Sequence, residues 1–480
     1  MSNYIGIDLG TSGVKILLVS KVGKILNEVT ESYPVSYPQS GWSEQNPGDW
    51  FDAVLRGLKK LNAKDVAGIS CGGQMHGLVI LDDKDVVICP CILWNDGRTG
   101  EQTNYLNNVI GKDKLRDCTA NIAFAGFTAP KLLWLKENEP ENFGKIAKIM
   151  LPKDYIIYRL TGEFTTDYSD ASGTLLFDVK NRRWSEEMCV ICGIYGGQLP
   201  KLYESYAPVG YVKKHISDKF GWGKVTVAAG AGDNAAAAVG TGTVNGADCN
   251  ISLGTSGTLF IANDGFSLPE NSALHSFCHA TGRYHYLGCI LSAASANKWW
   301  IEDILGANYN LAEKAAKKIG KNEVIFQPYL MGERCPHNDV FARGAFIGLS
   351  AETTKEDMAL AVLEGVAFAF RDCLEIAKEN GLKVTCSTVC GGGAKSKLWQ
   401  KILSNVLNLK LYTVETEQGP AYGAAMLAMV ACGAYKSVEE ASQSLVKKVI
   451  SVTQDSELVK AYDIKYSRYK RLYPLLKTLN

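Results

Sequence analysis

Residues 7–13 read IDLGTSG, and residues 251–257 read ISLGTSG. Six of the seven residues are identical, and each copy leads into an apolar run, VKILLVS in the first and TLFIAN in the second. This pattern predicts a strand, a tight polar turn and a returning strand. Because the copies lie about half the chain apart, we expect a duplicated chain whose two halves share a fold and enclose the active site in a central cleft. A chance match between common residues is the alternative.

The predicted boundary lies near residues 245–248 and divides the chain into an N-terminal domain, 1–245, and a C-terminal domain, 246–480. A chain of 480 residues, 46% of them hydrophobic, is too long for a single hydrophobic core and long enough for two. Two domains are therefore expected from length as well as from the repeat.

Strands and helices are predicted to alternate in both halves, which is typical of an α/β fold. Three apolar runs joined by short turns predict a three-strand meander over residues 4–35. A helix is expected over residues 47–61, capped by Asp49, and a buried strand over residues 66–70. The second half follows this order more loosely. It ends in a helix with a packing stripe of tyrosines, Tyr462, Tyr466, Tyr469 and Tyr473.

Composition excludes several classes of function. Lys and Arg total 51 and Asp and Glu total 50, so a net charge of +1 predicts no nucleic-acid partner. The chain has no apolar run of about 18 residues and no leader pattern, so we expect a cytoplasmic protein with no membrane partner. The 14 cysteines are scattered and several lie in apolar runs, which favours free buried thiols. The HSFCH segment at 275–279 is interpreted as core or pocket wall rather than a zinc site.

Three glycine-rich turns follow predicted strands, at residues 9–13, 253–257 and 391–396. Glycine lets backbone N–H groups approach phosphate closely, and a helix that follows adds a favourable dipole. One such turn is usually only a hairpin, but three in a duplicated chain favour nucleotide binding. The GxxxxGK[ST] and GxGxxG motifs of other nucleotide-binding folds are missing from the sequence.

Two carboxylates are candidates for chemistry. Asp8 of the first turn is replaced by Ser252 in the second, and one carboxylate at the cleft suits one Mg²⁺ ion beside the nucleotide phosphates. Asp233 follows a buried strand and a glycine loop and begins a helix of small residues. Its place fits a general base for phosphoryl transfer, and a plain helix N-cap is the alternative.

Mixed polar and aromatic loops at 72–77, GGQMHG, and 93–98, LWNDGR, suit a polyol. Trp94 can pack on the carbon skeleton, while polar side chains exchange hydrogen bonds with hydroxyls: His76, Asn95, Asp96 and Arg98. A solvent-facing loop without a ligand is the alternative.

At these residues the chain resembles the FGGY family of carbohydrate kinases, and the resemblance covers nearly its whole length. The motifs that carry it, in chain order, are YIGIDLGTSGVK, WSEQNPGDW, GQMHG, ILWNDGR, GFTAPKLLWL, LPKDY, TGEF, SDASGT, GAGDNAAAAVG, SLGTSGT, HSFCHA, FQPYLMGERCPHN, VLEGVAFA, GGGAKSKLWQ and GPAYGAA. The resemblance implies two ribonuclease H-like domains of the actin and hexokinase type, with acceptor and base in the first and nucleotide in the second. They are expected to close on ATP, Mg²⁺ and a sugar.

The resemblance also implies roles for single residues. Asp233 would be the catalytic base and Asp8 would serve the metal. The implied sugar-binding residues are Met75, His76, Trp94, Asp96, Asp233 and Asn234. The implied nucleotide contacts are Gly10, Thr11, Ser12, Lys15, Gly254, Thr255, Gly391, Gly392, Gly393 and Ala394. Trp299 is a candidate for stacking on adenine, and a homodimer is expected from the family.

The expected reaction is ATP-dependent phosphorylation of the C5 hydroxyl of D-xylulose, favoured by the pair Met75 and His76 and by WNDGR. The alternatives within the family are kinases for ribulose, another ketose, gluconate or glycerol. An actin-like switch that uses ATP to bind protein is the alternative from another class.

Overall fold

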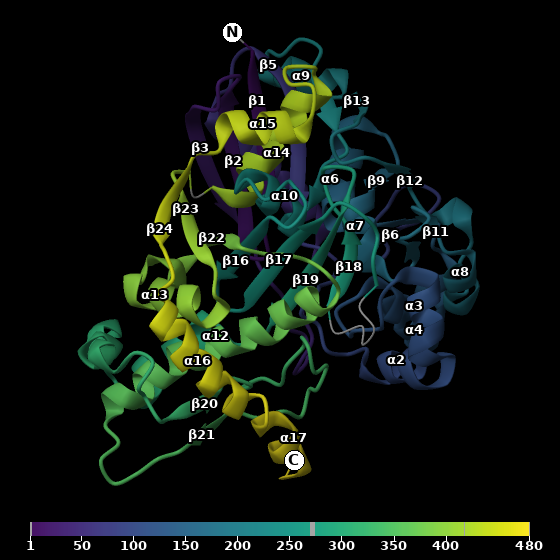
Figure 1. Cartoon of the computed structure of the whole chain (residues 1–480). Helices are drawn as coiled ribbons and strands as arrows, with labels where there is room; N and C mark the ends of the chain where they lie inside the picture. Colours follow the sequence, from purple (N-terminus) through teal and green to yellow (C-terminus); the bar gives the residue numbers. More distant parts are fainter. Residues whose placement is uncertain (1, 269–273, 417, 480) are drawn as a thin grey trace. The chain divides into compact units, whose positions relative to one another are not determined.

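The computed structural model describes residues 2–268, 274–416 and 418–479 (Figure 1). The chain forms two compact units, each built on its own sheet. Unit 1 comprises Met1–Val244, Ser276–Tyr284 and Gln418–Val446, and unit 2 comprises Asn245–His275, His285–Glu417 and Lys447–Asn480. The first segment of unit 1 thus ends where the repeat suggested a boundary, and two later segments also belong to that unit.

The sheet of unit 1 has the order β13-β14-β5-β1-β2-β3, with β15 also paired to β5. Its strands are β1 Asn3–Leu9, β2 Gly13–Ser20, β3 Ile25–Ser32, β5 Val66–Gly73, β13 Pro208–Tyr211, β14 Thr226–Ala228 and β15 Ala231–Gly232. Strands β1, β2 and β3 form the predicted antiparallel meander, and β5 runs parallel to β1. The meander and the buried strand are therefore confirmed (Figure 1).

The helices of unit 1 are α1 Pro47–Leu61, α2 Gly100–Asn104, α3 Lys112–Thr119, α4 Thr128–Asn138, α5 Pro140–Gly144, α6 Pro152–Thr161, α7 Tyr168–Ala171, α8 Glu186–Cys192, α9 Lys214–Phe220, α10 Asp233–Gly240, α14 Gly419–Ala431 and α15 Val438–Leu445. Helix α1 has the predicted bounds, but the predicted cap is wrong. Asn46 caps it by accepting a hydrogen bond from the Gly48 N–H, and Asp49 lies in the first turn. The cap precedes Pro47 because proline has no N–H and is favoured at the first helical position.

Helix α14 belongs to unit 1 although it follows most of unit 2 in the chain (Figure 1). Glycines allow its close approach: a Cβ on Gly6 of β1 would lie 1.9 Å from the Ala421 carbonyl oxygen. A Cβ on Gly423 would likewise lie 1.9 Å from the carbonyl oxygen of Ala236 in α10. No side chain fits in that space, so α14 packs backbone to backbone against β1 and α10.

Short strand pairs complete unit 1: β4 Glu44–Gln45 with β7 Cys91–Ile92, β6 Val79–Leu81 with β8 Lys148–Met150, β9 Thr165–Asp167 with β12 Lys201–Tyr203, and β10 Phe177–Asp178 with β11 Arg183–Trp184. They hold the loops that carry the predicted sugar-binding residues and the segment before Asp233.

The second seven-stranded sheet runs β18-β19-β17-β16-β22-β23-β24, with β18 His275–Cys278 as an edge strand. Its other strands are β16 Cys249–Leu253, β17 Gly257–Asn263, β19 Tyr284–Ile290, β22 Cys386–Cys390, β23 Lys410–Val414 and β24 Lys448–Val452, beside the pair β20 Ile325–Gln327 and β21 Ala345–Ile347. Strand β16 is antiparallel to β17 and parallel to β22, as β1 is antiparallel to β2 and parallel to β5 in unit 1. The two repeated heptads thus form equivalent hairpins, and the α/β fold in both halves is confirmed.

The helices of unit 2 are α11 Ala294–Lys298, α12 Lys355–Glu379, α13 Lys397–Leu407, α16 Ser456–Tyr469 and α17 Leu472–Leu476. Thr354 begins the long, mostly buried α12 with a capping box to Asp357. The predicted tyrosine stripe lies in the core as expected, with Tyr462, Tyr466 and Tyr469 buried on α16. Tyr473, predicted in the same helix, lies instead in the next helix, α17.

Candidate active site

Asp8 and Asp233 come from neighbouring strands at one edge of the unit 1 sheet. Strands β1, β5 and β15 are parallel, and Asp8 pairs in register with Gly72, which pairs in turn with Ala231. Asp233 follows β15 directly as the first residue of α10. The carboxyl ends of parallel strands form the usual ligand-binding edge of such sheets. The fold therefore brings together the two carboxylates that the sequence singled out.

The environment of this edge disfavours negative charge. Burial and then the nearby carboxylate of Asp233 raise the pKa of Asp8 to about 7, although Lys15 opposes the shift. Burial raises the pKa of Asp233 to about 6, against hydrogen bonds from the backbone and side chain of Asn234. A carboxylate with a pKa near neutrality can both accept and release a proton, as a general base must.

Asp233 is not the N-cap of its helix, because Gly232 occupies that position. Its Oδ1 accepts hydrogen bonds from Asn234 N at 2.7 Å and Asn234 Nδ2 at 2.8 Å. Its Oδ2 accepts none from the described residues. One oxygen is thus held in place while the other remains available to an acceptor hydroxyl.

The hairpin turn of unit 1 is anchored through Thr11. Its hydroxyl accepts a hydrogen bond from Trp94 Nε1 at 3.0 Å and donates one to Gln74 Oε1 at 3.2 Å. Its carbonyl oxygen accepts one from Gln45 Nε2 at 2.7 Å. The predicted nucleotide contact Thr11 and the predicted sugar contact Trp94 therefore touch each other, while Ser12 at the tip is exposed.

Two further nucleotide contacts predicted in unit 1 lie beside this turn. The Gly10 N–H bonds to the Gly13 carbonyl oxygen at 3.0 Å and closes the hairpin. Lys15 lies opposite Asp8 in the β1–β2 register, and its Nζ donates to Gln418 Oε1 at 2.6 Å. An ammonium group has three donors, so Lys15 can also bind an anion near Asp8.

The loop after β5 presents Met75 and His76. His76 has a φ of 69°, a conformation that side chains rarely adopt without support. Thr128 and Lys131 supply it, because Thr128 Oγ1 and Lys131 Nζ both donate to the His76 carbonyl oxygen, at 3.1 and 2.9 Å. The ring stacks on Phe127 with centroids 4.6 Å apart. Sequence reasoning missed both supports, although a lysine inside the apolar run KLLWL was a signal.

The tautomer of His76 follows from its contact with Gly173. The ring Nδ1 lies 2.6 Å from the Gly173 carbonyl oxygen, which can only accept, so Nδ1 carries the proton. In the neutral ring Nε2 is then an acceptor, the role that a donating sugar hydroxyl requires. Met75 is buried and packs against Gly232, and its Sδ lies 4.0 Å from Asn234 Nδ2. Met75 and Asn234 thus adjoin Asp233.

Asp96 uses its carboxylate inside the loop. Oδ1 accepts from Arg98 N and Nε, both at 2.9 Å, and Oδ2 accepts from Ser43 N at 2.6 Å and Arg98 Nη2 at 2.7 Å. These four bonds fill the acceptor positions of a carboxylate. A sugar contact through Asp96 would have to displace one of them. Asn95, by contrast, is exposed.

Unit 2 contains a cavity of about 780 Å³ lined by the other two glycine turns. Its wall includes Thr255 of the repeated heptad, Gly392 and Gly393 of the GGGAKS turn and the start of α13. This volume is typical of a pocket for a small organic ligand. Glycine backbone and a helix N-terminus at one wall suit the phosphates of a nucleotide.

Gly391 allows the GGGAKS turn to pack closely against the strand that leads into the LGTSG turn of unit 2. Its φ is 91°, and a Cβ there would lie 2.7 Å from the Leu253 carbonyl oxygen in the strand that precedes Gly254. Gly393 is equally close packed, with a Cβ position 2.9 Å from the Trp399 ring. Ala394, at the end of the turn, is buried. The predicted contacts Gly254, Thr255 and 391–394 thus come together in unit 2.

Three lysines at this cavity were missed by sequence reasoning: Lys298, Lys395 and Lys397. They add positive charge where phosphates are expected. Trp299, the candidate for stacking on adenine, is instead stacked on Phe326, with ring centroids 6.4 Å apart. Tyr309 is the aromatic side chain at the cavity wall that is exposed enough to receive a planar ring.

Among residues 2–268, 274–416 and 418–479, no three metal-ligating side chains gather into a preformed metal site. Mg²⁺ does not require one, because it is usually bound by one or two carboxylates together with substrate phosphates. Asp8 fits this role, since its oxygens accept no hydrogen bond from the described residues. The histidines of the HSFCH segment are buried, as expected of core. Within the same described ranges, no helix has the length and apolarity needed to cross a membrane.

The sheet edge of unit 1 has two carboxylates and polar loops, and unit 2 has a glycine-lined cavity; these are features that a kinase for a small polar acceptor requires. The comparisons agree. The N-terminal domain of the FGGY family of carbohydrate kinases matches residues 3–240, and its C-terminal domain matches residues 249–432. The chain belongs to the FGGY family of carbohydrate kinases.

Several relatives span the whole chain. A curated xylulose kinase from Escherichia coli (strain K12) is 40% identical over 484 residues, which cover 99% of each chain. A crystal structure described as a "xyloylose kinase" from Brucella ovis superposes with a TM-score of 0.95 at 40% identity, covering 100% of both chains. A gluconate kinase from Lactobacillus acidophilus also gives a TM-score of 0.95, at 27% identity, covering 99% of this chain and 98% of its own.

Proposed function

We propose that this carbohydrate kinase transfers the γ-phosphoryl group of ATP to the C5 hydroxyl of D-xylulose, with Asp233 as the general base. The observation that carries the choice of sugar is the 40% identity, over the full length, to a protein described as a xylulose kinase. The fold alone does not choose the acceptor, because a gluconate kinase matches it with the same TM-score.

In the proposed reaction, Oδ2 of Asp233 accepts the proton of the sugar hydroxyl as that oxygen attacks the γ-phosphorus. The bond from the γ-phosphorus to the bridging oxygen breaks, and ADP leaves with those electrons. Burial supports this role because it raises the pKa of Asp233 to about 6, near the working pH. Met75, His76, Trp94 and Asn234 would orient the sugar, and Asp96 would hold the loop that carries Trp94.

The nucleotide is proposed to bind with its phosphates on the glycine turns and its base in the unit 2 cavity. Gly254, Thr255 and the turn at 391–394 support this assignment through their shared position. In unit 1, Asp8 is proposed to serve the metal, and Lys15, Gly10, Thr11 and Ser12 are proposed to contact the nucleotide. Mg²⁺ held at Asp8 would supply neutralisation of the charge on the phosphates.

The test is ADP release with D-xylulose, D-ribulose, L-ribulose, L-xylulose, gluconate and glycerol. The phosphorylated carbon is then identified by phosphorus–carbon coupling in the NMR spectrum of the product. We expect D-xylulose to have the highest kcat/KM and its product to carry phosphate on C5. A higher kcat/KM for another acceptor overturns the assigned substrate. If none of these acceptors supports ADP release, the assigned reaction is overturned.

A further inference from the structure

The loop before Asp233 contains no large side chain that could hold it in place. It runs through Ala229, Gly230, Ala231 and Gly232, and Gly230 has a φ of 77°. Ala231 and Gly232 form β15 and pair with β5. Two further contacts hold the backbone: Gly230 N donates to the Ser205 carbonyl oxygen at 3.0 Å, and Gly232 N donates to Ser169 Oγ at 3.2 Å. The position of Asp233 therefore depends on this strand pairing and on two serines from distant parts of unit 1.

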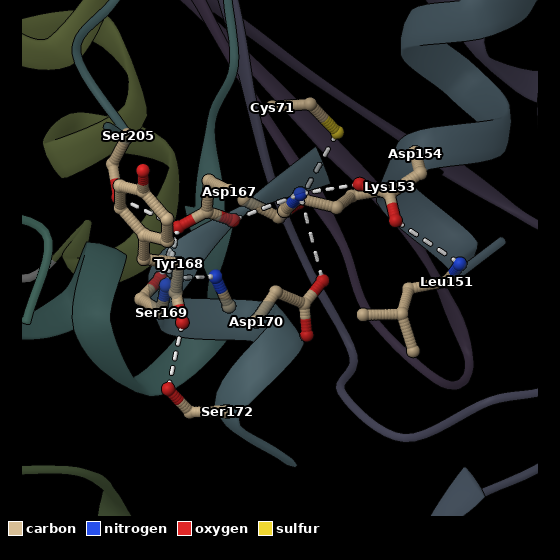
Figure 2. Close-up of polar contacts among 12 residues, drawn as sticks. Cys71, Leu151, Lys153, Asp154, Asp167, Tyr168, Ser169, Asp170, Ser172 and Ser205 are labelled. Atoms are coloured by element: carbon tan, nitrogen blue, oxygen red, sulfur yellow. Dashed lines mark hydrogen bonds and ion pairs between the residues drawn. The ribbon is translucent and has the colours of Figure 1, made fainter. Parts of the chain in front are cut away.

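Both serines are bound to one buried carboxylate (Figure 2). Ser169 Oγ donates to Asp167 Oδ2 at 2.5 Å, and Ser205 Oγ donates to the same oxygen at 2.7 Å. Because its hydroxyl proton points to Asp167, the Ser169 oxygen turns its lone pairs elsewhere and can accept the Gly232 N–H. A continuous chain of hydrogen bonds thus runs from Asp167 to the residue before Asp233.

The opposite side of Asp167 is fixed by Lys153. Lys153 Nζ lies 2.9 Å from Asp167 Oδ1, 2.5 Å from Asp154 Oδ1 and 3.7 Å from Asp170 Oδ2 (Figure 2). All four side chains are buried. Burial opposes the charge of Lys153, but the surrounding carboxylates hold its pKa above the ordinary value, so the ammonium persists. In such a low-dielectric place each charged contact restrains geometry strongly.

We propose that Asp167 is a positioning residue for the general base: anchored by Lys153, it orients Ser169 and Ser205, which fix the loop that sets the place of Asp233. This inference rests on the proposed role of Asp233 but not on which sugar is the acceptor. Misplacing a reacting group by about 1 Å can lower a rate by about 10²-fold. The network should therefore be visible in kcat.

The experiment compares two variants with two matched controls. Ser169→Ala removes the hydroxyl that links Asp167 to Gly232. Asp167→Asn replaces one carboxylate oxygen by an NH2 group, so either the serines or Lys153 loses its acceptor. Asp154→Asn removes an equally buried carboxylate from the same lysine but leaves the serines untouched, because Asp154 contacts Lys153 and the Leu151 N–H. Ser172→Ala removes a hydroxyl near Ser169 that bonds to the Tyr168 carbonyl oxygen and the Cys278 N–H.

We expect kcat to fall about 10²-fold in Asp167→Asn and about tenfold in Ser169→Ala, with a smaller change in the KM for sugar. Both controls should keep wild-type kcat when folded, which is checked by circular dichroism. If Asp167→Asn does not fold, the milder pair Ser169→Ala and Ser172→Ala decides alone. Equal kcat values in that pair, or a loss confined to the KM for sugar, overturn the proposal.

A double variant separates positioning from general structural damage. In a background of Asp233→Asn, the base is already lost, so adding Ser169→Ala should lower the residual rate no further. A further loss equal to that in the wild type would mean that Ser169 acts independently of Asp233. Wild-type turnover of at least one sugar is measured first. If it is absent, the proposed function fails, whereas an active wild type with unaffected variants refutes only the positioning role.

Discussion

The two LGTSG hairpins share a sequence and a strand arrangement, yet their surroundings differ. In unit 1 the turn is bound by side chains, since Gln45, Gln74 and Trp94 all contact Thr11. In unit 2 the turn is bound mainly by backbone: the Thr255 carbonyl oxygen accepts from Ala293 N at 3.1 Å and Ser295 N at 3.2 Å, and from the Ser295 hydroxyl at 2.8 Å. The first turn therefore lies in a crowded polar network, and the second borders a cavity of about 780 Å³.

This comparison shows how a duplicated element can take up two tasks. The backbone of the hairpin stays the same because its glycines determine the turn. One substitution within the heptad, aspartate at 8 against serine at 252, gives only unit 1 a carboxylate at this place. We therefore propose that acid–base chemistry lies in unit 1 and that unit 2 recognises most of the nucleotide, and the following variants test that division.

The largest effect is expected from Asp233→Asn. The amide keeps the size of the carboxylate and can still accept from the Asn234 N–H, so the fold should persist. General-base catalysis contributes about 10² to 10⁴-fold, and kcat should fall by that factor. The measurement is steady-state ADP release, with the exposed Asp52→Ala as control. An Asp233→Asn enzyme with kcat near the wild-type value would contradict the assigned base.

The next largest effect is expected from Asp8→Ser, which makes the heptad of unit 1 identical to that of unit 2. Loss of one electrostatic partner of the transferred group should lower kcat on the order of 10²-fold, and more Mg²⁺ should be needed for half-maximal rate. A magnesium titration of the rate measures both. Ser252→Ala is the matched change in the other hairpin and should leave the magnesium titration unchanged. If both variants shift it equally, the two hairpins do not differ in metal binding.

A smaller effect, on the KM for ATP alone, is expected from Gly391→Ala. The new Cβ would lie 2.7 Å from the Leu253 carbonyl oxygen, so the turn must move. The KM for ATP should rise about tenfold, the factor that corresponds to a loss of about 1.4 kcal/mol in binding, with little change in the KM for sugar. Gly381→Ala shares a positive φ, 87°, but meets open space, and it separates backbone strain from the clash. A rise in the KM for sugar instead would place this turn in the acceptor site.

The smallest effect concerns pH. A carboxylate must be ionised to act as a base, and burial raises the pKa of Asp233 to about 6. As pH falls through about 6 the carboxylate takes up a proton, so log kcat/KM should decline with a slope approaching one. At pH 5 the rate should be about tenfold below its plateau. The profile is measured at saturating Mg²⁺, and the residual activity of Asp233→Asn should lack this limb. A wild-type plateau that continues to pH 5 would contradict the raised pKa.

Local features of the fold could be predicted because they depend on local physics. The hairpins follow from alternating apolar residues around glycine turns, and the bounds of α1 follow from its apolar face. The predicted cap, Asp49, is wrong because aspartate is favoured both at the N-cap and in the first turn of a helix. Pro47 marks the first helical position, so the residue before it, Asn46, is the cap. Sequence pattern locates a helix better than it locates the residue that caps it.

Residues of the candidate site could be predicted where they belong to a short sequence motif. Asp8, Asp233 and the glycine turns were found because glycine and isolated carboxylates stand out in apolar strands. Lys153 and Asp167 were not, because their role arises from contacts between segments far apart in the chain. Likewise the hydrogen bonds from Arg98 and Ser43 that occupy the carboxylate of Asp96 form only in the folded chain, so the sequence of the loop does not reveal them.

The late return of α14 to unit 1 imposes an order on biosynthesis. A nascent chain released to residue 244 exposes the glycine surface of β1 and α10, since the helix that covers it has not been translated. At the usual rate of synthesis the ribosome takes on the order of ten to forty seconds to reach residue 446. Throughout that interval the half that carries Asp233 is incomplete, so the proposed catalytic base reaches its final setting only after residue 446 has been synthesised.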